Sequence, residues 1–300
     1  MPPLAKAPAQ VAGRPEPDQR TFASADDAVK SLLDAVKARN RDEIKRIFGA
    51  PAMGELISSD PIEGEKDFQH FIGHATEQLR LEKQSERKAR LIIGQKEWPF
   101  PIPVVQAPAG QWFFDTEAGK REILARRIGH DELATIKVCR AYVQAQREYA
   151  SKDRDGSGVL QYAQHYWSTP GQKDGLYWEA AAGEEPRPLG PLIAGAALQE
   201  CLSRKTKLEP RPFHGYYFRI LTQQGPAAPG GRYAYIVNGH MLAGFALVAW
   251  PAEYDSSGIM TFIINHTGKL YEQDLGPDTG QRAQAMTEYN PDHAWTLVRE

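Results

Sequence analysis

The pattern of apolar and polar positions is most regular in residues 213–276, where four apolar runs alternate with turn-forming residues. The runs are rich in aromatic and β-branched residues and comprise Tyr216–Leu221, Tyr233–Val237, Phe245–Trp250 and Ile259–Asn265. Gly, Pro, Asn and Ser lie between them and either break strands or permit positive φ. The pattern therefore predicts an antiparallel sheet with tight connections. A hairpin after Asn265 returns the chain to a further strand.

One of these runs also indicates how the sheet is covered. In Ile259–Asn265 both alternating sets of positions are largely apolar, whereas a strand with one face in water alternates more cleanly. We therefore expect both faces of the sheet to be buried. A long helix would cover one face, and the N-terminal domain or the aromatic connection before the sheet would cover the other.

Apolar residues at helical spacing predict several helices in the first part of the chain. Ser24 has the chemistry of an N-cap for a first helix, and Asn40 for a second helix that ends before Gly49. A third amphipathic helix is expected over Pro61–Leu81. These helices precede a stretch with strand character.

That stretch predicts a small sheet followed by another helix. Ala89–Gly94 and Gln111–Asp115 are expected strands, and Trp98–Pro103 is expected to be an edge or a surface strap because its prolines cannot donate ladder hydrogen bonds. Thr116 is the expected cap of a helix over Glu117–Ile128. The first domain is thus predicted to be α+β.

A second long helix is predicted over Asp131–Ala150, separated from the preceding one by Gly129. It has a broad apolar face and is expected to pack across the sheet. The predicted fold is α+β, with N-terminal helices and a small antiparallel sheet followed by a long helix packed on an antiparallel β-sheet. The expected divisions are a disordered or extended tether over 1–20, an N-terminal α+β domain over 21–128 and a second α+β domain over 129–300.

Composition and charge narrow the class of protein. The formal net charge is −2, with no concentrated excess of Lys and Arg, which argues against a nucleic-acid partner. The longest nearly uncharged apolar runs, Leu189–Leu198 and Met241–Trp250, are about half of the roughly 20 residues that a spanning helix needs, so no transmembrane segment is expected. Cys139 and Cys201 can form one disulfide in an exported protein or remain free core residues.

Two patterns carry potential metal ligands. Asp153, Asp155 and Ser157 offer hard oxygens around a glycine turn, which is typical of a calcium loop, although an EF-hand in this register would lack two carboxylates. The alternative is a polar turn that ends the preceding helix. His70 and His74 share a helix face with Glu77, but a solvated polar face is the competing interpretation. Calcium is thus the candidate ion, and no other cofactor is expected.

The candidate binding residues are mostly aromatic. Trp98 and Phe100 in the proline-rich strap, and Trp250 and Tyr254 at the end of a predicted strand, could form contact surfaces. The competing interpretation is that these rings pin the chain to the core. His214 is the best candidate for chemistry, although a lone loop histidine is more often a surface residue.

Several long segments resemble a known family. WPFPIP, FDTEAGKREILARRIG, STPGQKDGLYW, FHGYYFRILTQQGPAAPGG and GFALVAWPAEYDSSGIMTFIIN resemble the bacterial domain-of-unknown-function family 2950. The resemblance covers nearly the whole chain after the tether and implies export to the periplasm or secretion, but no activity. The long helix and the strands after it also resemble the globular part of type IV pilins and pseudopilins, although pilins begin with a processed apolar helix.

These observations leave more than one function open. The first hypothesis is non-enzymatic binding or scaffolding in the bacterial cell envelope, with an envelope protein or a small ligand as partner. The second is a hydrolase, for which the sequence has no GxSxG, HExxH or SxxK arrangement. The third is a small-ligand or calcium-binding module.

Overall fold

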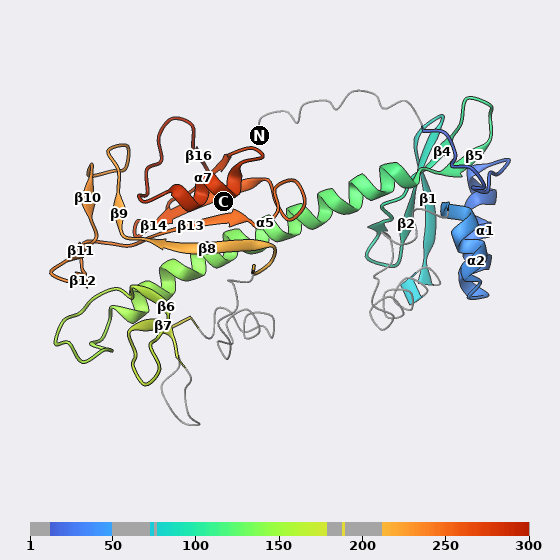
Figure 1. Ribbon diagram of the computed structural model, residues 1–300. Helices are drawn as coiled ribbons and strands as arrows, with labels where there is room; N and C mark the ends of the chain where they lie inside the picture. The colour runs from blue at the N-terminus through green and yellow to red at the C-terminus, as the bar shows by residue number, and fades with distance from the viewer. Residues whose placement is uncertain (1–12, 50–72, 75–76, 179–187, 190–211, 300) are drawn as a thin grey trace. The chain divides into compact units, whose positions relative to one another are not determined.

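The computed structural model describes residues 13–49, 73–74, 77–178, 188–189 and 212–299 (Figure 1). The chain divides into two compact units, Met1–Arg126 and Arg127–Glu300. Helices and antiparallel sheets occur in both, which confirms the predicted α+β class. Within the described ranges, no helix has the length and apolar character needed to cross a membrane.

The first unit packs two short helices against a sheet. The helices are α1 (Ala25–Lys37) and α2 (Arg41–Phe48), and the strands are β1 (Leu79–Ser85), β2 (Lys88–Ile93), β3 (Trp98–Pro99), β4 (Val104–Gln106) and β5 (Trp112–Phe114). The strand order is β1-β2-β4-β5, with β3 also paired to β2 and every pairing antiparallel. The expected extended strap thus includes a short strand.

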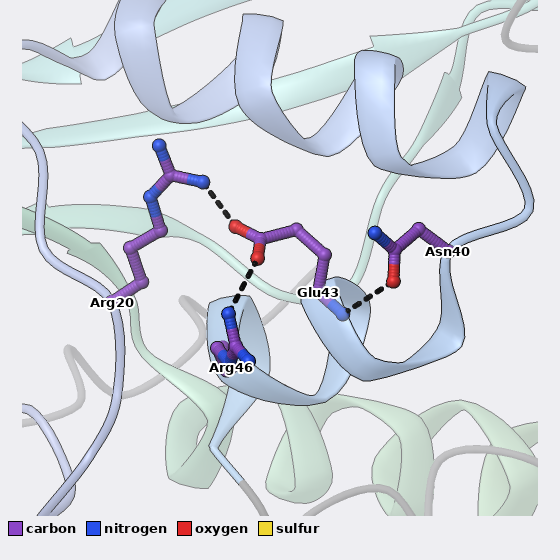
Figure 2. A network of polar contacts seen from close by, with 4 residues as sticks. All are labelled: Arg20, Asn40, Glu43 and Arg46. Atoms are coloured by element: carbon purple, nitrogen blue, oxygen red, sulfur yellow. Dashed lines mark hydrogen bonds and ion pairs between the residues drawn. The ribbon is translucent and has the colours of Figure 1, made fainter.

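Both predicted N-caps are confirmed. The Ser24 side chain accepts a hydrogen bond from the Asp27 backbone N–H, and Asn40 Oδ1 accepts one from the Glu43 backbone N–H at 3.0 Å. Figure 2 shows the side chains of Arg20 and Arg46 directed at the Glu43 carboxylate, which forms an ion pair with each. The segment before α1 is thereby joined to α2.

The core of the first unit lies between these helices and the sheet. The Phe48 ring lies 5.1 Å from the Phe114 ring and 6.2 Å from the Phe100 ring, measured between centroids. Leu32, Ile47 and other apolar residues of the helices complete this cluster. The apolar stripes predicted from helical spacing are therefore the buried faces.

A single long helix, α5 (Thr116–Tyr149), replaces the two helices predicted on either side of Gly129. The prediction of a break was wrong because one glycine costs only about 1 kcal/mol in a helix interior, and good helix formers flank it on both sides. The expected cap was also wrong. Asp115 Oδ1 accepts from the Ala118 backbone N–H at 2.9 Å, whereas the Thr116 hydroxyl donates to the Phe48 carbonyl at 2.6 Å.

The helix predicted over Pro61–Leu81 lies largely outside the described residues. Its last part differs from the prediction, since Leu79–Leu81 belongs to β1 and pairs with β2. Leu79, Leu81 and their neighbours alternate with polar residues, so the end of the helical pattern overlaps a period-two pattern.

The second unit contains the sheet predicted from residues 213–276. Its strands are β8 (Tyr216–Leu221), β13 (Ala246–Pro251), β14 (Met260–Asn265), β15 (Leu270–Asp274) and β16 (Thr296–Leu297). They are antiparallel in the order β16-β15-β14-β13-β8. Three of the four predicted runs are confirmed as strands of this sheet, as is the return strand after Asn265.

The fourth run, Tyr233–Val237, is not part of this sheet. It divides into β10 (Tyr233–Ala234), which pairs with β9 (Gln223–Gln224), and β11 (Ile236–Val237), which pairs with β12 (His240–Met241). The division falls at Tyr235, a fully buried residue whose hydroxyl donates to Gln224 Oε1 at 3.0 Å. A third small sheet pairs β6 (His165–Trp167) with β7 (Gly175–Tyr177) in parallel.

Both faces of the main sheet are covered, as the apolar pattern predicted. Every residue of β13 is buried. The C-terminal part of α5 packs on one face, where the Tyr142 ring lies 5.5 Å from the Phe245 ring. Arg219, on β8, donates from Nη2 to the carbonyls of Ala283 and Met286, at the end of α7 (Thr279–Ala285). This helix, which also packs against β13, was not predicted. The sequence pattern had suggested the N-terminal domain or the aromatic connection as the cover of the second face.

Candidate functional site

A groove in the first unit is the strongest candidate for a binding site. It has a volume of about 280 Å³ and lies between the start of α5, strand β2 and the strap that follows β3. Phe100, Pro101 and Pro103 supply its apolar lining. Three segments that are separate in the sequence thus form one groove.

A glycine explains how the helix approaches the strap so closely. A Cβ atom at Gly119 would lie 2.6 Å from Ile102 Cγ1, closer than Cβ atoms are found to other atoms in proteins, and 3.2 Å from Ile102 Cα. The first turns of α5 therefore rest directly on the strap. This contact places the helix side of the groove directly against its proline-rich side.

The polar lining of the groove is mainly cationic. Lys88, Arg90, Arg121 and Arg126 line it, against the single carboxylate of Glu122. Within the described part of the chain, no ion pair joins a carboxylate to Lys88 or Arg121. The Arg90 guanidinium lies beside Gln84, whose amide oxygen, when turned toward it, accepts from Nη2 and Nε at 3.0 and 3.1 Å. The groove therefore presents uncompensated positive charge.

Trp98 lies next to the groove and contacts Arg126, which lines it. The Arg126 guanidinium lies over the Trp98 ring, 5.4 Å from its centroid, and donates to the Pro99 carbonyl at 2.7 Å and to Glu122 Oε1 at 2.9 Å. The Trp98 side chain is 47% exposed, whereas Phe100 is only 9% exposed. Of the two predicted strap residues, Trp98 offers an aromatic surface and Phe100 lines the groove while belonging to the core.

The other two candidate aromatic residues lie in the second unit. Trp250 is only 7% exposed and its ring lies 5.8 Å from that of Tyr217, so it belongs to the main core and offers little surface. The Tyr254 hydroxyl donates to Asp274 Oδ2 at 3.3 Å. The groove includes neither residue.

His214 lies in a tight turn beside the start of the second-unit part of α5. It lies close to His130 and Asp131. One ring nitrogen of each histidine and one carboxylate oxygen of Asp131 all lie within 4.8 Å of one another. Ser257 lies close to the turn, but its hydroxyl donates to the Glu253 carbonyl at 3.1 Å. In the described chain, this serine is therefore not arranged as a nucleophile activated by an imidazole.

The predicted calcium loop is closed by its own hydrogen bonds. Asp153 accepts from the backbone N–H groups of Ser157 and Gly158, and Asp155 accepts from Ser157 N–H and, at 2.6 Å, from Gln161 Nε2. Burial raises the pKa of Asp155, but hydrogen bonds from the Ser157 side chain and backbone outweigh it and lower this pKa below its ordinary value. The polar turn explains the pattern, and calcium binding stays a prediction.

Among the described residues, the remaining candidate ligands form no further group of three. His74 Nδ1 lies 3.6 Å from Glu77 Oε2, while His70 lies outside the described residues. Cys139 is a free, fully buried thiol, and Cys201 also lies outside the described residues. Burial raises the pKa of the Cys139 thiol to about 12, so it stays protonated and unreactive near neutral pH.

These features define an α+β protein with a cationic groove in one unit and a covered antiparallel sheet in the other. Residues 19–298 match the family described as "Protein of unknown function (DUF2950)". Because this match covers most of the chain, the protein belongs to that family. No match was found among curated proteins or among solved structures.

Proposed function

We propose that the protein is a non-enzymatic binding protein of the bacterial cell envelope, whose first-unit groove binds a carboxylate-rich segment of a partner protein. The observation that supports this proposal most strongly is the cationic lining of the groove. Four Lys and Arg side chains converge there around one carboxylate, in a protein whose formal net charge is −2. A local excess of positive charge in a near-neutral chain favours an acidic partner.

The size of the groove favours a protein segment over an enclosed small ligand. Pockets that bury drug-sized molecules usually measure about 300–1,000 Å³. This groove, at about 280 Å³, is at the small end of that range. It can accommodate one or two carboxylate side chains while the rest of the partner contacts the surface around it.

The exposed Trp98 ring adds an apolar contact beside the charges. Tryptophan and arginine are, with tyrosine, the residues most enriched among those that dominate the binding energy of protein interfaces. Arg126 holds the Trp98 ring from one side, so the ring is already ordered before a partner binds. Less side-chain entropy is then lost on association.

The envelope location is part of the same proposal. It is supported by the Pro- and Ala-rich composition of residues 1–12, which resembles that of a tether, and by the resemblance of the chain to exported proteins. The partner would then be another envelope protein.

A titration of a fluorescent Glu-rich peptide that contains an aromatic residue, monitored by anisotropy, tests the groove. The double variant Lys88→Glu/Arg121→Glu removes positive charge from the groove, and we expect it to weaken binding by at least about tenfold. The wild-type affinity should also fall steeply between about 50 and 200 mM salt.

The matched control is Lys30→Glu/Arg140→Glu, which makes the same change of net charge at exposed positions on α1 and α5 away from the groove. We expect this control to bind the peptide within about twofold of wild type. Equal weakening in both double variants would show that net charge, and not the groove, governs binding, and would refute the proposal.

A further inference from the structure

A second candidate site lies in the second unit, where two histidines and an aspartate converge from segments more than eighty residues apart. His130 and Asp131 belong to α5, and His214 belongs to the turn that opens β8. We propose that these three residues bind a divalent transition metal ion of the zinc class. This inference is independent of the groove, which belongs to the first unit.

The geometry of the three side chains suits such an ion. One ligand atom from each residue lies within 4.8 Å of the others, and His130 Nδ1 lies 3.3 Å from Asp131 Oδ1. In a tetrahedral zinc site with bonds of about 2.0–2.1 Å, neighbouring ligand atoms are about 3.3 Å apart. One pair already has this spacing, and a rotation of the exposed His214 ring brings in the third ligand.

The backbone presents His214 toward α5. Phe213 and Tyr216 exchange backbone hydrogen bonds of 2.8 and 3.0 Å across a two-residue turn. Both central residues have positive φ, 47° for His214 and 70° for Gly215, as a type I′ turn requires. A Cβ at Gly215 would lie 3.0 Å from Asp131 Oδ2, so glycine permits the turn to lie against the aspartate.

The helix side of the site is also held in place. Glu132 Oε1 accepts hydrogen bonds from the backbone N–H groups of Ile259 and Met260, at 2.9 and 3.0 Å. The adjacent Asp131 is therefore carried by a helix turn that is anchored to the main sheet. Both sides of the site thus rest on regular structure.

The donor set indicates the class of metal. Two imidazoles and one carboxylate favour zinc, nickel or copper, whereas calcium and magnesium prefer sites made of oxygen ligands. His130 and His214 are exposed, so water completes the coordination from the open side. A bound ion would join the turn before β8 to α5.

Isothermal titration of the full chain, without an affinity tag and after chelator treatment, with ZnCl₂ tests the site. We expect saturable one-to-one binding, accompanied by a rise in melting temperature. His214→Ala and Asp131→Asn should each weaken zinc binding by at least about tenfold, since even residues that only support a ligand contribute about 10–100-fold. Circular dichroism establishes that each variant is folded.

His293→Ala is the matched control, because His293 is also an exposed histidine of the second unit. It should bind zinc as wild type does. Zinc binding that is unchanged in His214→Ala but lost in His74→Ala would place the ion elsewhere and overturn the proposal. The absence of saturable binding at about 1 mM zinc, far above the dissociation constants usual for such donor sets, would overturn it as well.

Discussion

Replacing Gln146 by leucine tests how the second unit holds the segment after α5. Gln146 is fully buried on this helix, and its side-chain amide pairs with a single backbone residue. Its Oε1 accepts from the Ala163 N–H at 2.8 Å, and its Nε2 donates to the Ala163 carbonyl at 2.8 Å and to Tyr142 Oη at 2.9 Å. The side-chain amide thus satisfies both the N–H and the carbonyl of Ala163, as a paired strand would.

The structure sets the size of the effect. Leucine has a similar volume but no polar atoms, so Gln146→Leu leaves the N–H and the carbonyl of Ala163 without partners. Each orphaned buried group costs about 1–3 kcal/mol. Ala163 is only 1% exposed, so water cannot replace the lost bonds without a local rearrangement. We therefore expect a loss of at least about 2 kcal/mol in the free energy of unfolding.

Two measurements check this expectation. Urea unfolding gives the change in free energy, and hydrogen exchange by mass spectrometry gives the protection of the Ala163 amide. The control is Gln144→Leu, the same substitution at an exposed position of the same helix, which should change stability by less than about 0.5 kcal/mol. If Gln146→Leu changes stability no more than the control and leaves the Ala163 amide protected, the bonds do not have the assigned role.

Two further predictions concern the second unit. Gly258→Ala would place a methyl group on the hydroxyl of the fully buried Tyr216, so thermal denaturation should show a loss of about 1–3 kcal/mol, whereas Gly280→Ala in α7, with open space around it, should gain up to about 1 kcal/mol. Equal melting temperatures for these variants would contradict the packing described. Burial, followed by the nearby Arg147 cation, lowers the pKa of His266 below 6.5 in the folded state, so the unfolded state binds more protons below that pH and stability falls as the pH falls. Wild type should therefore lose more stability than His266→Gln between about pH 7 and pH 5.5 in urea titrations, and parallel losses would refute this assignment.

The main sheet could be predicted from the sequence because its strands carry strong local signals. Runs of aromatic and β-branched residues alternate with turns that contain Gly and Asn. In Ile259–Asn265 both alternating sets of positions are largely apolar, which predicted burial of both faces of the sheet. Ser24 and Asn40 identified their helices for the same reason, since N-capping is a contact between residues two or three positions apart.

Features that depend on competition or on distant contacts were not predicted. Gly129 suggested a helix end, but the cooperativity of a long helix outweighs one glycine. The short helix α7 has a weak apolar pattern and is defined by its contacts with Arg219 and β13. Tyr235 divides its run because its side chain is buried and its hydroxyl donates to Gln224, a contact that the local pattern does not indicate.

The candidate sites also depend on contacts between residues that are distant in the sequence. Trp98 and Phe100 could be selected from the sequence as aromatic residues among prolines. The cationic side chains near them come from β2 and α5, which are separate in the sequence, so no local pattern indicated them. Similarly, His214 looked solitary because its neighbours His130 and Asp131 lie on a distant segment. Only the fold brings these groups together.

A photo-crosslinking residue placed at Ala125, an exposed position that lines the groove, tests the proposed function most directly. Irradiation of bacterial envelopes that contain this protein should attach it to a partner through a peptide rich in Asp and Glu. The crosslink should disappear when Lys88→Glu and Arg121→Glu are added, and it should not form from the same crosslinker at Lys30. An identical crosslink in the charge-reversed protein, or attachment to neutral or basic peptides, would contradict the account.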